Sequence, residues 1–188
     1  MGKLYIAYGS NLNMRQMYIR CPGAKFLGTG VIENYALQFK GSPHSAYATI
    51  APQAGSSVPV GVWQIQKRDE TRLDVYEGYD PKGYCHYDKE QIPVKVENGM
   101  EIKGMVYIMD KTKDFGFPSY GYYQTVLQGY GDCGLDTRVL EKALKESVQL
   151  AREQTRRAQE AQAQNVQEPN EIQETQEQQE PVEQMQFV

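Results

Sequence analysis

The sequence contains little histidine, tryptophan or cysteine, and it has no long hydrophobic run. Of its 188 residues, two are His, one is Trp and three are Cys. No stretch approaches the roughly 20 apolar residues that a membrane-spanning helix needs. Twenty basic residues stand against 24 acidic ones, so there is no basic excess of the kind that nucleic-acid binding requires. The sequence therefore predicts a protein with neither a membrane nor a nucleic acid as partner.

The cysteines and the N-terminus together indicate a reducing compartment. Cys21, Cys85 and Cys133 form no Cys-x-x-Cys pair, which argues against a zinc ribbon and against a disulfide scaffold. The chain reaches Gly9 without the apolar core of a signal peptide. We therefore expect a cytoplasmic protein.

Several familiar catalytic and cofactor motifs are absent. Cys85 and His86 are adjacent on an expected strand, where neighbours point to opposite faces, so they cannot act as nucleophile and base. The segment 28–30 (Gly-Thr-Gly) lacks the third glycine of a dinucleotide fingerprint and is better interpreted as a strand kink. The sequence has neither a phosphate-binding loop nor ligands at metal spacing. We expect no cofactor and no metal.

The composition changes near residue 150. Residues 151–188 hold 11 Gln, 8 Glu and 3 Arg, a net charge of −5, which leaves +1 for residues 1–150. A Gln/Glu-rich segment with two prolines buries too little apolar surface to offset its ordering entropy. We expect one domain over 1–150 and, over 151–188, a helix extension that frays into disorder. A role of this tail as an interaction arm stays open, with its partner unknown.

Hydrophobic periodicity over 1–150 predicts a mixture of strands and helices. Helices are expected at 14–21, 69–76 and 119–128 and around 139–148; strands are expected at 3–7, 35–39, 46–50, 58–65, 84–96 and 101–109. Asn13 is a candidate N-cap, with Gln16 in the reciprocal position of a capping box. Asn98-Gly99 predicts a two-residue hairpin turn. The fold class is α+β: a small curled sheet or mixed barrel with helices around it.

The turn after the first strand is a candidate anion site. Tyr8-Gly9-Ser10-Asn11 leads from the strand into a helix start, where backbone N–H groups have no acceptor within the helix. Such groups suit a carboxylate, a phosphate or a developing oxyanion. An ordinary strand-to-helix turn remains the alternative.

Glu77 is a candidate general base. If its helix ends at Gly78, the carboxylate lies at the negative end of the helix dipole, where it is disfavoured by roughly 0.3–1 kcal/mol. Neighbouring tyrosines would also desolvate it, and both effects raise a carboxyl pKa. A pKa near neutrality is what a general base requires. A solvated glutamate at a helix end is the alternative.

Six short motifs, in order, resemble the γ-glutamylcyclotransferase family. They extend to about residue 144, over nearly all of the expected domain, whereas the tail has no counterpart. The motifs are Tyr5-Ile6-Ala7-Tyr8-Gly9-Ser10-Asn11-Leu12, Ala48-Thr49-Ile50, Val60-Gly61-Val62-Trp63, Leu73-Asp74-Val75-Tyr76-Glu77-Gly78, Gly83-Tyr84 and Tyr107-Ile108-Met109.

The resemblance implies a fold, an activity and a set of site residues. The fold is a small mixed barrel with flanking helices, and the activity is cofactor-free cleavage of a γ-glutamyl amide with release of 5-oxoproline. Glu77 matches the catalytic acid/base. The residues expected to contact the substrate are Tyr5, Ile6, Ala7, Tyr8, Gly9, Ser10, Asn11, Tyr84, Tyr107 and, from the tyrosine-rich segment 118–123, Tyr122.

Two questions stay open at this point. The first is whether the chain is a catalyst or a non-catalytic binding module for a γ-glutamyl or related small molecule. The second is the identity of the leaving amine, which the loops 41–45 and 120–123 are expected to select.

Overall fold

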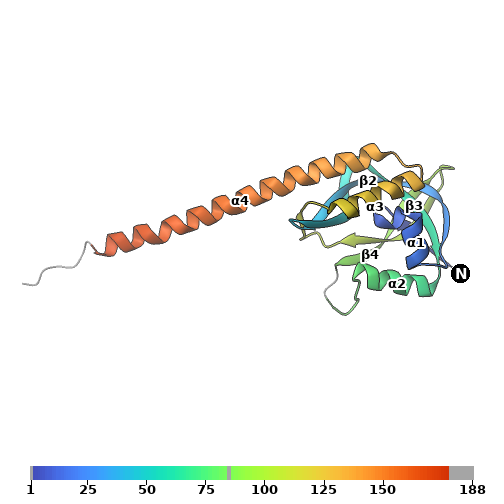
Figure 1. Cartoon of the computed structure of the whole chain (residues 1–188), viewed down its shortest axis with the longest axis horizontal. Coiled ribbons are helices and arrows are strands. Elements are labelled where there is room, and N and C mark those ends of the chain that lie inside the picture. The colour runs from blue at the N-terminus through green and yellow to red at the C-terminus, as the bar shows by residue number, and fades with distance from the viewer. Residues whose placement is uncertain (1, 84–85, 178–188) are drawn as a thin grey trace, which may run out of the picture. The chain divides into compact units, whose positions relative to one another are not determined.

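The computed structural model describes residues 2–83 and 86–177 (Figure 1). The chain divides into two units, Met1–Ala151 and Arg152–Val188. The first unit holds all six strands and the helices α1, α2 and α3. Among the described residues, no helix is both long enough and apolar enough to cross a membrane.

Five strands close into a mixed barrel, and a sixth short strand extends it. The strands are β1 (Lys3–Ala7), β2 (Lys25–Ser42), β3 (Ser45–Ile65), β4 (Tyr87–Val96), β5 (Glu101–Met109) and β6 (Asp114–Phe115). The order is β3-β1-β5-β4-β2-β6, and β2 also pairs with β3 to close the ring. Only β1 and β5 run parallel; the other pairs are antiparallel. The predicted α+β barrel is confirmed.

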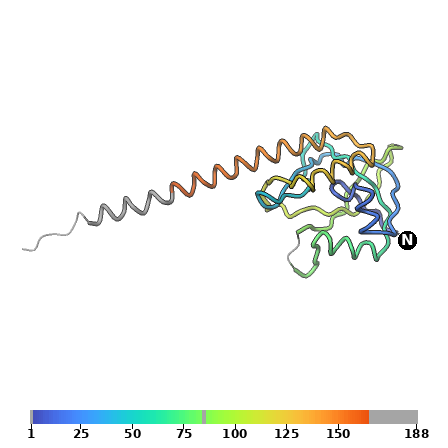
Figure 2. The backbone as a smooth tube through the Cα atoms, in the orientation of Figure 1, coloured from blue at the N-terminus to red at the C-terminus, as the bar shows by residue number. Residues whose placement is uncertain are grey.

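The longest feature of the barrel is the hairpin formed by β2 and β3, which Figure 2 follows in blue to cyan. The two predicted strands 35–39 and 46–50 are its inner part, beside the turn. The register shifts between Phe26 and Gly28 and again between Glu33 and Tyr35. The first shift lies just before the segment 28–30, where a kink was predicted; the segment itself pairs in regular register with residues 60–62. Such bulges bend a strand and increase its twist, which helps a sheet to close.

The hairpin between β4 and β5 is confirmed, but its turn differs from the prediction. Val96 N donates to Met100 O at 2.9 Å, so three residues, 97–99, form the loop instead of two. Gly99 N donates to Val96 O at 2.8 Å, and Gly99 has a φ of 80°. Three-residue hairpin loops favour a turn that is followed by one residue in the left-handed conformation. Gly99 is that residue here.

Four α-helices and one 3₁₀ turn complete the described chain. They are η1 (Ser10–Leu12), α1 (Met14–Arg20), α2 (Lys67–Glu77), α3 (Tyr120–Asp132) and α4 (Thr137–Glu177). Asn13 caps α1 as predicted, since its Oδ1 accepts from Gln16 N at 3.0 Å. The reciprocal role of Gln16 was wrong, because its side chain accepts instead from Arg20.

Helix α4 begins in the first unit and continues through the segment that composition marks as a tail. Asp136 accepts from Arg138 N at 3.0 Å, so Asp136 caps the helix. Leu140, Ala143 and Ser147 of its first part are buried. The fraying predicted for the tail falls in part on residues 178–188, which lie outside the described residues.

An ion cluster ties α2 to the barrel. Glu70, on α2, is only 3 % exposed, and Lys3 of β1 and Lys89 of β4 each lie within 3.0 Å of its carboxylate. Lys67 adds a third contact at 3.3 Å. Burial opposes ionisation, but the three lysines lower the pKa of Glu70 to about 2. The charged form of Glu70 therefore stabilises the helix that carries Glu77.

We predict that Glu70→Gln lowers the free energy of unfolding at pH 7 by roughly 1–2 kcal/mol, a modest value because two of the lysines are largely solvated. The pKa is depressed in the folded state, so the advantage of the wild type is present above about pH 4.5 and shrinks as the pH falls toward 2. Urea unfolding at several pH values measures this difference. Lys67→Gln, which removes the longest of these contacts, is the control with a small effect. A difference that stays constant with pH would contradict the assignment.

Candidate functional site

The position of Glu77 follows from how α2 begins and ends. Gln66 and Asp69 form a capping box at its start, with Asp69 Oδ2 accepting from Gln66 N at 3.0 Å. At its end Gly78 adopts a left-handed φ of 64°, and Tyr79 N donates to Asp74 O at 2.8 Å. Glycine reaches this conformation without strain, which makes it the usual residue just past a helix end. Glu77 is therefore the last residue of the helix, as predicted.

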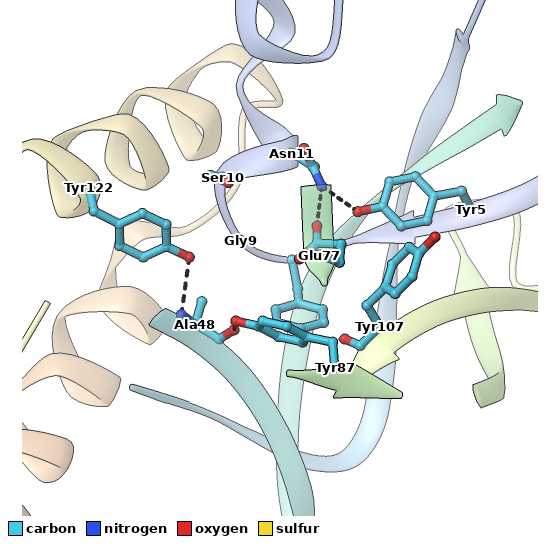
Figure 3. Close-up of a pocket in the computed structure, with 10 residues that line it drawn as sticks. Tyr5, Gly9, Ser10, Asn11, Ala48, Glu77, Tyr87, Tyr107 and Tyr122 are labelled. Atoms are coloured by element: carbon cyan, nitrogen blue, oxygen red, sulfur yellow. Dashed lines mark hydrogen bonds between the residues drawn. The ribbon is translucent and has the colours of Figure 1, made fainter. Parts of the chain in front are cut away.

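The carboxylate of Glu77 is held by the turn that follows β1. Asn11 Nδ2 donates to Glu77 Oε1 at 2.8 Å and to the hydroxyl of Tyr5 at 2.7 Å. Figure 3 shows Asn11 between these two side chains. Within the described residues, the carboxylate of Glu77 has no hydrogen-bond partner besides Asn11.

Arg20, at the end of α1, fixes the orientation of the Asn11 amide. Its guanidinium donates to Asn11 Oδ1 at 2.5 Å and to Ser10 Oγ at 3.2 Å. A guanidinium can only donate, so the oxygen of Asn11 must face Arg20 and its NH₂ group must face Glu77. The ring of Tyr76 lies 3.7 Å from the guanidinium carbon and holds it in place. Arg20 forms no salt bridge with a carboxylate in the described part of the chain.

The pKa of Glu77 is raised to about 7. Burial of the carboxyl group is the largest cause, and it outweighs the opposing effects of Arg20 and of the hydrogen bond from Asn11. The pKa shift proposed from the sequence is therefore present, although its main source is desolvation. Near neutral pH this side chain is divided between the protonated and ionised forms, as a group that takes and returns a proton must be.

Glu77 and Asn11 line a cavity, and tyrosines form most of the rest of its wall. Tyr122 OH accepts from Ala48 N at 3.0 Å, and Tyr87 OH donates to Ala48 O at 2.9 Å. On the other side, Tyr107 OH donates to Asp74 at 2.6 Å. Burial raises the pKa of the lining tyrosines, so they stay neutral at physiological pH. The cavity thus combines neutral hydroxyl groups with one titrating carboxyl group.

Most of the predicted site residues line this one cavity. They are Tyr5, Tyr8, Gly9, Ser10, Asn11, Glu77, Tyr107 and Tyr122. Ile6 and Ala7 belong to the core instead, each 1 % exposed, so the geometry gives no support to their predicted contact with substrate. Tyr84 lies outside the described residues.

The tyrosine-rich segment contributes one residue to the cavity. Tyr122 is that residue, whereas Tyr120 is 80 % exposed and Tyr123 packs against Phe39. Helix α3 begins at Tyr120, so these three side chains point in different directions around its first turn.

Four functional residues were missed from the sequence. Ala48 and Tyr87 line the cavity, Arg20 orients Asn11, and Asp74 holds Tyr107. Ala48 and Asp74 lay within motifs already noted, but Arg20 and Tyr87 carried no local signal of a site. Their roles depend on contacts between elements far apart in the chain.

The site combines a titrating carboxyl group with backbone N–H donors. Among the described residues, no three His, Cys, Asp or Glu side chains come together as a metal site. The backbone N–H groups of Ser10 and Asn11 begin η1 and therefore have no acceptor inside it. An anionic oxygen bound there would lie beside Asn11 and thus close to Glu77.

The comparisons with known proteins agree on one family. Residues 5–125 match the family model described as "Gamma-glutamyl cyclotransferase, AIG2-like". The chain is 30 % identical over 146 residues to γ-glutamylcyclotransferase of Homo sapiens, covering 74 % of this chain and 76 % of the human protein. Its Bos taurus counterpart is 29 % identical over 147 residues, with the same coverage.

Solved structures show the same relationship. A structure named "Gamma-glutamyl cyclotransferase" superposes with a TM-score of 0.68 at 28 % identity, covering 76 % of this chain and 86 % of that chain. The Bacillus subtilis protein YkqA, at 19 % identity and a TM-score of 0.64, shares the fold; it covers 79 % of this chain and 54 % of its own.

The raised pKa of Glu77 predicts a pH-dependent loss of stability. The folded state keeps its proton up to about pH 7, whereas the unfolded state releases it near 4.5, so folding becomes less favourable as the pH rises between these values. Glu77→Gln removes this dependence. We expect the variant to gain on the order of 1–3 kcal/mol relative to wild type between pH 4.5 and pH 8. Urea unfolding at several pH values measures this difference in the free energy of unfolding. Glu90→Gln, at an exposed position, is the control. A difference that does not change with pH would contradict the prediction.

Proposed function

The chain belongs to the γ-glutamyl cyclotransferase, AIG2-like family, and we propose that it cleaves a γ-glutamyl amide by attack of the substrate's own α-amino group, releasing 5-oxoproline and an amine. The observation that carries the proposal is a buried carboxyl group of pKa about 7 in a polar cavity, held by Asn11. Glu77 is the general acid/base of this reaction.

The pKa of Glu77 decides whether it can start the reaction. The α-ammonium group, with a pKa of roughly 8, must lose a proton before its nitrogen can attack. Transfer to a carboxylate of pKa about 7 costs roughly 1.4 kcal/mol, whereas transfer to an ordinary glutamate of pKa roughly 4.3 costs about 5 kcal/mol. Burial of Glu77 therefore removes most of the free-energy cost of this proton transfer.

The cavity then has to hold the substrate in a folded geometry. The nitrogen attacks the γ-carbonyl carbon of the same molecule. Such oriented intramolecular reactions have an activation free energy lower by on the order of 7–11 kcal/mol, because the translational and rotational entropy is already lost before the reaction. The N–H groups at the start of η1 bind an anionic oxygen, either the α-carboxylate or the oxyanion of the tetrahedral intermediate. The tyrosine hydroxyls line the remaining wall.

The same carboxyl group completes the reaction. Protonated Glu77 gives its proton to the leaving nitrogen as the bond from the γ-carbon to that nitrogen breaks. Ionised Glu77 then takes the second proton from the ring nitrogen and passes it to the departing amine, so the neutral five-membered lactam and an ammonium ion leave. Both protons lost by the α-ammonium group thus end on the leaving amine, Glu77 is again ionised, and no other reactant is consumed.

We predict that Glu77→Gln reduces kcat for 5-oxoproline release by about 10²–10⁴-fold, the usual contribution of a general acid/base. γ-Glutamyl-alanine is a suitable first substrate, and chromatography of 5-oxoproline gives the rate. Glu90→Gln, on the exposed side of β4, is the matched control and keeps wild-type turnover.

Two outcomes of that experiment would contradict the proposal. Undiminished turnover by Glu77→Gln would remove Glu77 from the mechanism. A wild-type protein that binds 5-oxoproline tightly but consumes no substrate from a γ-glutamyl panel would instead be a binding module.

Arg20→Gln tests how the carboxylate is tuned. The substitution removes a positive charge and frees the Asn11 amide to rotate, and both changes favour the protonated form of Glu77. We expect the acidic limb of the pH profile of kcat/KM to move upward by about 1. Arg15→Gln, on an exposed position of the same helix, leaves the limb in place. Reduced activity with an unmoved limb would mean that Arg20 acts only in folding.

A further inference from the structure

A second, larger cavity opens directly beside the one that holds Glu77. We call it the outer groove; its volume is about 720 Å³. Ser10, Glu77, Tyr87 and Tyr122 line both cavities, so the two cavities adjoin. The outer groove thus begins where the scissile amide must lie if Glu77 is to protonate the leaving nitrogen.

The lining of the outer groove is rich in exposed apolar surface. Tyr47 of β3 is 45 % exposed, and Val75 and Tyr76 of α2 are 80 % and 47 % exposed. Met109, at the end of β5, also lines the groove but is buried. Exposed apolar surface gathered around a hollow and bordered by polar residues is typical of a ligand-binding groove.

We infer that the outer groove binds the leaving amine, and that it selects an amine carrying an aromatic ring or a comparably large apolar group. This inference depends on the function proposed above and adds the substrate class to it. A volume of about 720 Å³ lies within the range of pockets that enclose drug-sized molecules, and far exceeds the needs of a methyl side chain.

Tyr47 is the residue best placed to make this selection. Its ring meets that of Tyr122 edge to face, with 4.9 Å between centroids and 82° between planes. It lines the outer groove but not the cavity around Glu77. Its exposed surface is therefore available to the leaving group without touching the carboxyl group that moves the proton.

The test compares γ-glutamyl-phenylalanine with γ-glutamyl-alanine by their kcat/KM ratio. We expect the wild type to favour the phenylalanine substrate by about tenfold or more, since larger apolar groups gain in a hydrophobic site. Tyr47→Ala lowers this ratio about fivefold, the size of one lost aromatic contact. Val75→Ser, at a more exposed position of α2, lowers the ratio about twofold. This second variant distinguishes the loss of a contact with the substrate from a folding defect caused by Tyr47→Ala.

Tyr120→Ala is the matched control, because Tyr120 is also an exposed tyrosine yet lines neither cavity. Its ratio equals that of the wild type. Equal rates for both substrates in the wild type, or a ratio unmoved by both groove variants, would overturn the inference while leaving the proposed function intact. If neither substrate releases 5-oxoproline, the proposed function itself fails.

Discussion

The site depends on one partly buried hydrogen bond, from the Asn11 amide to the carboxylate of Glu77. Burial drives this carboxyl group toward the protonated form, while the hydrogen bond and the charge of Arg20 draw it back toward the ionised form. The balance leaves the pKa of Glu77 near 7. Near neutral pH the group is therefore present in both the protonated and the ionised form, as a general acid/base requires. The amide donates in the required direction only because a guanidinium, which cannot accept, occupies its other end.

The barrel and its helices bring together three segments that lie far apart in the sequence: β1, β5 and α2. The parallel pairing of β1 with β5 places Tyr5 beside Met105, in the register that brings Tyr107 to the cavity. The capping box and the left-handed Gly78 fix where α2 starts and stops. The ion cluster around the buried Glu70 fastens the same helix to β1 and β4. Glu77 is thus positioned from both ends of its helix.

The sequence predicted the features that are local and missed those that arise from packing. Asn13 as a cap, Gly78 as a helix end and the hairpin around Gly99 all follow from short-range preferences. The strands β2 and β3 were predicted only in part, because two bulges interrupt their alternation. Arg20 was missed because it meets Asn11 through the fold of η1 onto α1, which no periodicity encodes. Likewise, the size of the outer groove depends on how β3 and α2 approach each other.

The most direct test of this account is the titration of the Glu77 side chain itself. Carbon-13 NMR of protein labelled at the glutamate carboxyl carbon follows each group with pH, and the signal lost in Glu77→Gln identifies the residue. The account predicts a midpoint at about pH 7 for that signal. A midpoint near 4.5, the value of an ordinary glutamate, would show that the carboxylate is solvated and that it cannot play the role assigned to it.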